Sequence, residues 1–300
     1  MEVSSKKDLA KRNKRKQLLT AWSFILPNFL GFFIFTLIPV VCSFGLAFMK
    51  WDAFNAPEFV GLKNFQKLVT DDTFQISLIN TLKYTIAVVP VTMAISLLLA
   101  VLLNRKMRGV KFFRTAFFFP YITSLVAIAT VWSMMFNPTM GPINTLLKTI
   151  ISSPPMWLAS SDWALWVIAM VSVWRDMGYY MILYLAGLQG IPKELYEASE
   201  MDGASKWKQV TNITLPSLRP TTFLVSVMLI IKCFQIFDLV QIMTEGGPGR
   251  STMVLVYQIY TEGFVKYNFG YASAISMVLF VIVLGITILQ FYWNNRQNKV

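Results

Sequence analysis

The stretch "IPKELYEASEMDGASKWKQVTNITLP", residues 191–216, is hydrophilic in a chain that is 55% hydrophobic and only 14% charged. Its charged side chains are concentrated between Lys193 and Lys208, and long apolar runs lie on both sides. A charge content this low is not that of an ordinary soluble domain and places the chain among membrane proteins. The question is which side of the membrane this stretch faces, and what it contacts.

Four long runs carry no charged residue, and each is long enough to cross the roughly 30 Å of hydrocarbon that about 20 helical residues span. The first follows a basic N-terminus, but it is too long for a secretory signal and is expected to be retained. Two more candidate spans contain internal charges. We therefore predict an all-α integral membrane protein with six transmembrane helices, at about residues 18–49, 82–103, 114–136, 163–188, 221–243 and 271–293.

Basic residues indicate the orientation, because Lys and Arg are retained on the cytoplasmic side. With the N-terminus inside, 18 of the 27 Lys and Arg residues lie in inner segments and 6 in outer loops. This predicts a cytoplasmic N-terminus (1–17), loop (190–219) and C-terminal tail (294–300). The net charge of +12 is therefore mostly a topology signal, and nucleic-acid binding is not expected.

The residue inventory excludes several kinds of chemistry. The two cysteines, Cys42 and Cys233, lie in apolar runs and there is no histidine, so neither a disulfide framework nor a metal site is expected. The stretch "GGPGRST", residues 246–252, lacks the Gly-Lys-Ser/Thr of a phosphate-binding loop and has no preceding strand. The chain is thus not expected to be an enzyme or to bind a cofactor, and any ATP hydrolysis would belong to another polypeptide.

Within 191–216 the signals predict one helix over 192–203 and a second short helical piece over about 204–210. Pro192 suits a first helical position, Glu194 and Glu197 suit a first turn, and Asp202-Gly203 is a strong stop. A solvated connector is the ordinary alternative for such a loop. Its apolar residues are too many for a free loop and favour a protein partner: Leu195, Tyr196, Ala198, Met201 and Trp207.

This stretch resembles the Glu-Ala-Ala loop (EAA motif) of permease subunits in ATP-binding-cassette (ABC) importers. Glu197, Ala198 and Ser199 are followed at the family's spacing by Gly203 and by Ile213, Leu215 and Pro216; only Ser199 departs, replacing the second alanine. The resemblance implies a type I ABC importer permease fold with both termini cytoplasmic. It also implies that a coupling helix contacts an ATPase through Tyr196, Glu197, Ala198, Ser199, Asp202, Gly203, Ile213, Leu215 and Pro216.

Two further blocks are similar to the carbohydrate-importing, maltose-permease-like branch: "VWRDMGYYMILYLAGLQGIP" (173–192) and "FDLVQIMTEGGPGRSTMVLVYQIYTEGFVKYNFGYASAISMVLF" (237–280). This resemblance implies a heterodimer with a second, homologous permease, two ATPase subunits that hold ATP-Mg, and an extracytoplasmic sugar-binding protein. It implies a bacterial or archaeal cell (inner) membrane. Docking of the binding protein is expected near Gly246, Gly247 and Pro248, which otherwise form a structural turn.

Charges inside two predicted spans also point to a site. Arg175 and Asp176 lie about 18 Å from the outer end of their span, and Lys232 about 17 Å from the inner end of the next, so they share a depth. Asp238 lies about 9 Å further out. Such groups must be paired or face a polar cavity. They can form an ion-pair network, a sugar pathway completed by Trp174, Tyr179, Tyr180 and Gln235, or both.

The leading hypothesis is the transmembrane channel-forming subunit of an ATP-driven importer that carries a sugar or oligosaccharide by alternating access. One alternative is an importer permease for a non-sugar solute. Another is an ion-coupled secondary transporter using Asp176 and Asp238, but residues 1–150 and 151–300 show no internal repeat of the kind usual in such folds. A purely structural scaffold would not explain the midplane charges.

Overall fold

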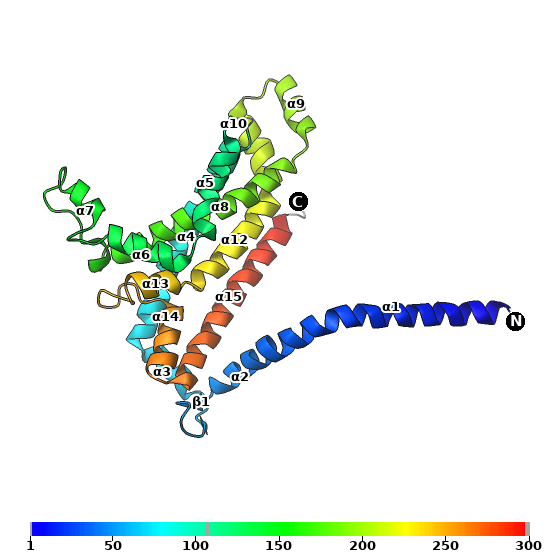
Figure 1. Cartoon of the computed structure of the whole chain (residues 1–300), viewed down its shortest axis with the longest axis horizontal. Coiled ribbons are helices and arrows are strands. Elements are labelled where there is room, and N and C mark those ends of the chain that lie inside the picture. Colours follow the sequence, from blue (N-terminus) through cyan, green and yellow to red (C-terminus); the bar gives the residue numbers. More distant parts are fainter. Residues whose placement is uncertain (1, 106–107, 298–300) are drawn as a thin grey trace.

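The chain folds almost entirely into helices (Figure 1). In the computed structural model, which describes residues 2–105 and 108–297, the only strands are β1 (Met49–Lys50) and β2 (Glu58–Phe59), paired antiparallel. Met1, residues 106–107 of a predicted inner loop and residues 298–300 of the predicted tail lie outside the described residues. The predicted all-α class is confirmed.

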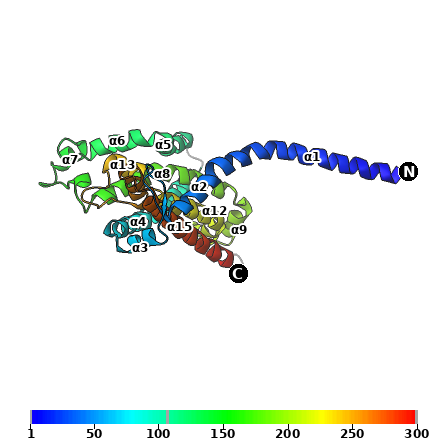
Figure 2. The same ribbon diagram turned by 90° about the horizontal axis from the view of Figure 1, so that it is seen from below.

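The first predicted span is part of a long helical segment that leaves the rest of the molecule. It consists of α1 (Glu2–Phe32), a π-helical turn η1 (Phe33–Leu37) and α2 (Ile38–Leu46). Figures 1 and 2 show α1 projecting away from the other helices. The most apolar part of the segment Asn13–Leu46 has no residue buried within the chain. Because such a surface is unfavourable in water, this segment requires lipid or another protein chain around it.

Four helices form the centre of the molecule. The helix α4 (Asp72–Leu103) packs along α8 (Ala164–Gln189), and α5 (Val110–Ile122) and α12 (Arg219–Phe234) pack against them. Gly178 of α8 permits the close approach of α5, because a Cβ at this position would lie 1.9 Å from the backbone oxygen of Phe117. This contact brings the end of α5 beside the charged residues of α8.

The predicted span at 114–136 is not one straight helix. The helices α5 and α6 (Leu125–Met135) meet at 94°, because Thr123 and Ser124 leave the helical conformation (ψ 149° and 125°). The predicted span at 221–243 is interrupted as well. Its helix α12 ends at Phe234, and α13 (Asp238–Met243) begins after a short non-helical segment.

Three helical segments of the described chain are long and apolar enough to cross a membrane, and five are if each of two bent pairs counts as one span. The second bent pair joins Lys206–Ser217 to α12 at 64°. The helix α8 has 26 residues, and at 1.5 Å per residue it is about 39 Å long. Its internal charges, Arg175 and Asp176, lower its apolar character. The count of six spans remains a prediction.

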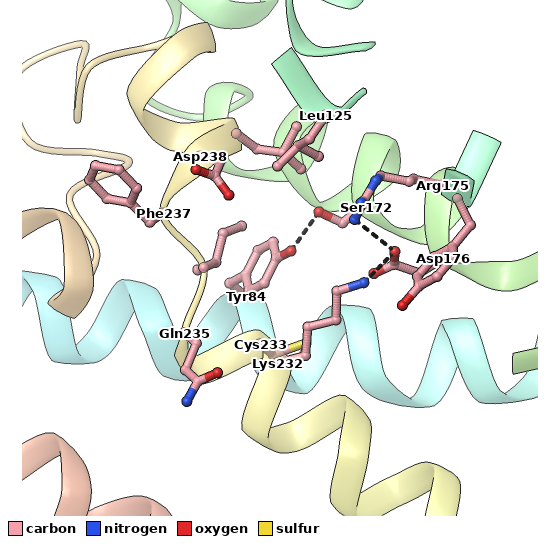
Figure 3. Close-up of a pocket in the computed structure, with 13 residues that line it drawn as sticks. Tyr84, Leu125, Ser172, Arg175, Asp176, Lys232, Cys233, Gln235, Phe237 and Asp238 are labelled. Carbon is pink, nitrogen blue, oxygen red and sulfur yellow. Dashed lines mark hydrogen bonds and ion pairs between the residues drawn. The ribbon is translucent and has the colours of Figure 1, made fainter. Parts of the chain in front are cut away.

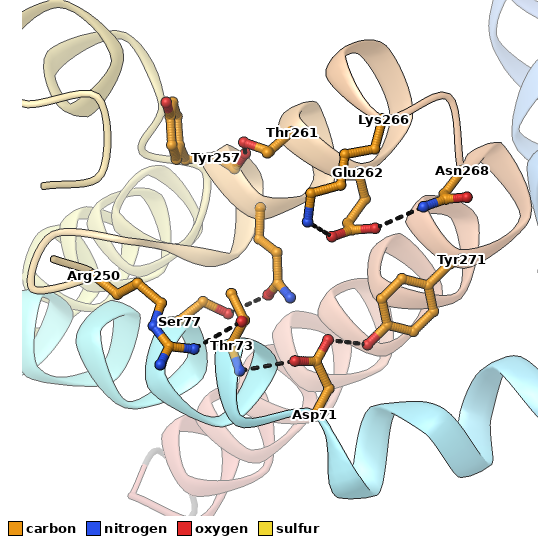
Figure 4. A network of polar contacts seen from close by, with 11 residues as sticks. Asp71, Thr73, Ser77, Arg250, Tyr257, Thr261, Glu262, Lys266, Asn268 and Tyr271 are labelled. Carbon is orange, nitrogen blue, oxygen red and sulfur yellow. Dashed lines mark hydrogen bonds and ion pairs between the residues drawn. The ribbon is translucent and has the colours of Figure 1, made fainter.

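Polar contacts fix the end of the molecule that holds β1 (Figure 4). Tyr271 of α15 (Phe269–Gln297) donates a 2.5 Å hydrogen bond to Asp71, and Ser77 of α4 donates one of 2.5 Å to Gln258 of α14 (Leu255–Tyr260). These bonds hold α14 and α15 against α4. The remaining short elements are α3 (Lys63–Thr70), α7 (Pro142–Leu147), the 3₁₀ turn η2 (Trp157–Ala159) and the π-helical turn η4 (Thr261–Val265).

The hydrophilic stretch at residues 191–216 forms the opposite end. It contains α9 (Lys193–Met201), α10 (Lys206–Gln209), a π-helical turn η3 (Val210–Thr214) and α11 (Leu215–Ser217). In Figure 1, α9 and α10 lie at the end of the molecule farthest from β1. This arrangement agrees with the prediction that the 190–219 loop and the first outer loop face opposite sides of the membrane.

Candidate functional site

A polar cavity of about 300 Å³ lies where α12 breaks and where α5 bends into α6 (Figure 3). The predicted pathway residues that line it are Arg175, Asp176, Lys232, Gln235 and Asp238. Tyr84, Tyr121, Leu125, Ser172, Cys233, Ile236, Phe237 and Leu239 complete the wall. The cavity thus joins residues from helices that are far apart in the sequence.

A cluster of three charges forms one side of the cavity. The Lys232 Nζ lies 2.5 Å from Asp176 Oδ1, and the Arg175 Nη1 lies 3.3 Å from the same oxygen. Only 5% of the Asp176 side chain is exposed, whereas 36% of the Lys232 side chain is. The shared depth predicted from the sequence therefore corresponds to a direct ion pair, in which one buried carboxylate compensates two cations.

Tyr121 is a cavity residue that the sequence analysis missed. Its ring centroid lies 5.0 Å from the Lys232 Nζ and 5.3 Å from the Arg175 guanidinium carbon, so the ring stabilises both cations. Nothing in the apolar sequence around it indicates this role, which depends on the bend between α5 and α6. Tyr84, also missed, donates a 2.5 Å hydrogen bond to Ser172.

Asp238 differs from Asp176 because it forms no ion pair with any residue that the structure describes. It is the first residue of α13, where the helix dipole favours a carboxylate. Gln235 and Phe237 also line the cavity, so the break between α12 and α13 contributes an acid, an amide and an aromatic ring to it. In Figure 3, Phe237 lies near Asp238, whereas Gln235 lies apart from it.

Three predicted aromatic residues lie outside this cavity wall. Trp174 packs edge-on against Trp132, with ring centroids 5.4 Å apart. Tyr179 lies one turn beyond Arg175 and stacks on Tyr121 at 4.4 Å, so Tyr121 covers it. Tyr180 is buried in the helix packing. These rings support the cavity from behind instead of lining it.

The predicted coupling residues belong to a protruding pair of helical segments, residues 193–217, which we call the tip. Gly203 has φ +71°, a left-handed conformation that ends α9, as the Asp-Gly stop predicts. Pro192 is the residue before α9 and not its first residue. The Tyr196 hydroxyl lies 2.9 Å from Thr214 Oγ1, and the buried Gln209 donates a 2.9 Å hydrogen bond to Ser199 Oγ.

Gln209 and Thr214 are the members of this tip that the sequence analysis missed. Both are polar residues inside the motif, and they connect the second helical piece to α9. The side chain of Lys206 bonds to Glu200, and this hydrogen bond lowers the pKa of the Glu200 carboxyl below its usual range. The tip is therefore a single structural unit.

The outer surface of the tip exposes large apolar side chains among its charged ones. Met201 is 91% exposed and Trp207 74% exposed, and Leu195 and Leu215 are exposed too. Glu197, Ala198 and Asp202 are also exposed, whereas Ser199 and Pro216 are half-buried and Ile213 packs against the core. The motif residues thus divide into a group that builds the tip and a group that is available to a partner.

The loop at Gly246, Gly247 and Pro248 is held from two sides. Asn80 of α4 donates 3.0 Å hydrogen bonds to the backbone oxygens of Arg250 and Met253. Thr252, fully buried, donates a 2.7 Å hydrogen bond to the Gly247 oxygen. The loop is therefore fixed in place at the end of the molecule opposite the tip.

Comparisons with known proteins agree with this architecture. The chain matches the family described as "Binding-protein-dependent transport system inner membrane component" over residues 92–299. It is 37% identical over 297 residues to the probable ABC transporter permease protein YesP of Bacillus subtilis (strain 168), with 96% of each chain covered. It is 32% identical over 277 residues to the probable starch degradation products transport system permease protein AmyD of Thermoanaerobacterium thermosulfurigenes, covering 92% of this chain and 94% of that protein.

A solved structure is similar over the same extent. The matching chain comes from a bacterial ABC transporter involved in the import of the acidic polysaccharide alginate. The two chains share 26% sequence identity and a TM-score of 0.84, and the match covers 96% of this chain and 98% of that one. The likeness in fold therefore extends over nearly the whole chain.

Proposed function

The chain belongs to the family of binding-protein-dependent transport system inner membrane components, and we propose that it forms the transmembrane pathway of an ATP-driven importer of a sugar or oligosaccharide. The membership confirms the resemblance predicted from the sequence and makes the chain a membrane permease subunit, not an enzyme. The proposal adds the cargo, the partners and the coupling mechanism.

The observation that carries the proposal is the tip. It is a preorganised helix pair with exposed Met201 and Trp207, and such an apolar surface is typical of a protein contact. Its two ends continue into α8 and α12, which carry Asp176 and Lys232. A partner that moves the tip would therefore move both walls of the cavity.

We assign ATP hydrolysis to that partner. An ATPase that closes on ATP-Mg would bind the tip in one conformation and favour one arrangement of α8 and α12 over the other, as alternating access requires. Two ATPase copies and a second, homologous permease complete the proposed assembly. The exposed first helix leaves room for the second permease, because lipid or a neighbouring chain would cover its apolar surface.

A sugar suits the composition of the cavity. Its carboxylates, amide and hydroxyls can exchange hydrogen bonds with sugar hydroxyls, and Phe237 offers an aromatic face for C–H groups. The names of AmyD and of the alginate importer state that those proteins transport carbohydrate. An ion-coupled mechanism is less favoured, because Asp176 is already paired with two cations.

A sugar-binding protein is the proposed partner at the opposite end. The loop at Gly246, Gly247 and Pro248 is held rigidly by Asn80 and Thr252, so it could be recognised without a loss of conformational entropy.

The test is purification of the tagged chain with its co-expressed neighbouring genes, followed by a screen of sugars for stimulated ATP hydrolysis. Glu197→Lys should abolish the stimulation and reduce co-purification of the ATPase, because it reverses the charge at the exposed centre of the motif. Glu194→Lys makes the same charge change one turn earlier, outside the motif, and should have a much smaller effect. Normal assembly and transport in Glu197→Lys would contradict the proposal and show that the tip only connects α8 to α12.

A further inference from the structure

A second cavity, of about 600 Å³, opens between α12 and α15 near the tip. It shares no residue with the polar cavity at the α12 break. In Figure 1, α12 and α15 run side by side, and the start of α12 lies near the end of α15. We call this cavity the α12–α15 groove.

The groove has the length of one lipid tail. Arg219 and Trp293 line it at the end near the tip, and Ile230 lines it farther along α12. From Arg219 to Ile230 the helix rises about 16 Å, which is close to half of the roughly 30 Å hydrocarbon core. The groove therefore extends from the membrane surface to the middle of the bilayer.

The groove is polar at its entrance and apolar at its inner end. Arg219, Trp293 and Asn294 provide a charged and polar entrance. Farther in, Gln290 donates a 3.2 Å hydrogen bond to Ser226, which provides a polar contact inside the groove. Along α12, Phe223 comes before Ser226 and Ile230 after it, and with Leu97 they provide apolar walls for an acyl chain.

The entrance favours an anion. Arg219 forms no ion pair with the residues that the structure describes, and no acidic side chain lines the groove. Arg219 also begins α12, whose amino end adds partial positive charge. Guanidinium groups bind phosphate oxygens in a bidentate manner, and Trp is enriched at the membrane surface.

We propose that the α12–α15 groove binds an anionic phospholipid, with its phosphate on Arg219 and one acyl chain between α12 and α15. Leu215 belongs both to this groove and to the tip, so the bound lipid contacts the element through which the partner ATPase would act. The proposal rests on the membrane location of the chain and is independent of its cargo.

The experiment is native mass spectrometry of the tagged chain, extracted with its partners and titrated with phosphatidylglycerol or phosphatidylcholine. We expect phosphatidylglycerol to be retained at least several-fold better, and Arg219→Gln to abolish the difference. Lys111→Gln removes an exposed cation of α5 outside the groove, and this control variant should keep the preference for phosphatidylglycerol. Ile230→Trp, which fills the apolar end, should reduce binding of both lipids.

Four results would overturn the proposal. Equal retention of the two lipids would exclude a site selective for anionic lipid. An unchanged preference in Arg219→Gln would show that Arg219 is not its source. Unchanged retention of both lipids in Ile230→Trp would show that no acyl chain occupies the apolar end of the groove. Cross-linking of a cysteine placed at Ile230 to a helix of a partner subunit would show that protein fills the groove. None of these results would contradict the proposed function, because that function is tested separately by sugar-stimulated ATP hydrolysis.

Discussion

Asp176 is the residue on which the charge balance of the polar cavity depends. It is buried and contacts two cations, Lys232 at 2.5 Å and Arg175 at 3.3 Å, through one carboxylate oxygen. The three residues are therefore not equivalent. Removing the acid leaves two cations in a low-dielectric region, whereas removing Lys232 leaves the acid paired with Arg175.

This asymmetry predicts unequal mutants. Asp176→Asn should lower the free energy of unfolding by about 3–5 kcal/mol, the range for breaking a buried pair. Lys232→Met should lower it by less, and the double mutant should lose less than the sum of the two. The coupling should lie in the range of about 0.5–3 kcal/mol typical of residues in contact. Thermal unfolding of the purified chain in detergent measures all three.

Lys83→Met serves as the control, because Lys83 is exposed and lies outside the charge cluster. Strictly additive losses for Asp176→Asn and Lys232→Met would contradict the ion pair. If the double mutant regains stability but not transport, the pair has a role in the sugar pathway besides its role in packing.

Sequence reasoning was sufficient for the charges but not for the rings. A charged residue in an apolar span must be paired or face a cavity, so depth alone placed Asp176 opposite Lys232. Trp174, Tyr179 and Tyr180 were assigned to the same wall, but Tyr121 occupies that place. Aromatic residues are equally stable in packing and in a cavity wall, so the sequence gives no way to distinguish them.

At the scale of elements, the tip is where local sequence signals were most informative. The Asp-Gly stop predicted the end of α9, and Gly203 indeed has φ +71°. The bends at Thr123–Ser124 and after Phe234 were not predicted. Pro120 lies inside α5, three residues before the first break, and no glycine or proline occurs at the second, so neither break is marked at its own position.

The geometry at Gly203 predicts the effect of a single methyl group. A Cβ there would meet no atom within 4 Å, so Gly203→Ala should cost only the left-handed strain, about 1–2 kcal/mol. The expected result is a loosened tip, measured as faster hydrogen exchange over residues 193–209 with little change elsewhere. Gly190→Ala is the matched control, because Gly190 has an ordinary helical φ of −81°. Equal exchange in both variants would contradict the assigned role of Gly203.

At the scale of the whole molecule, the same two helices connect both functional regions. The tip lies between α8 and α12, and these helices hold Asp176 and Lys232 against each other about 20–25 Å away along each helix. The two helices are therefore connected at two places, by the tip at one end and by the ion pair farther along. A displacement of the tip must either move α8 and α12 together or break the pair, so the charge cluster is suited to keep the two helices moving as one unit.

This mechanism requires the tip to lie on the ATP side of the membrane, which labelling can test. In a background with Cys42→Ala and Cys233→Ala, single cysteines would replace Lys208 in the tip and Ala56 between β1 and β2; both positions are exposed and lie at opposite ends. A membrane-impermeant maleimide should label position 56 in intact cells, and position 208 only after the membrane is opened. The prediction follows from the excess of basic residues in the inner segments. Labelling of position 208 from outside would reverse the topology and place the exposed Met201 and Trp207 beyond the reach of an ATPase.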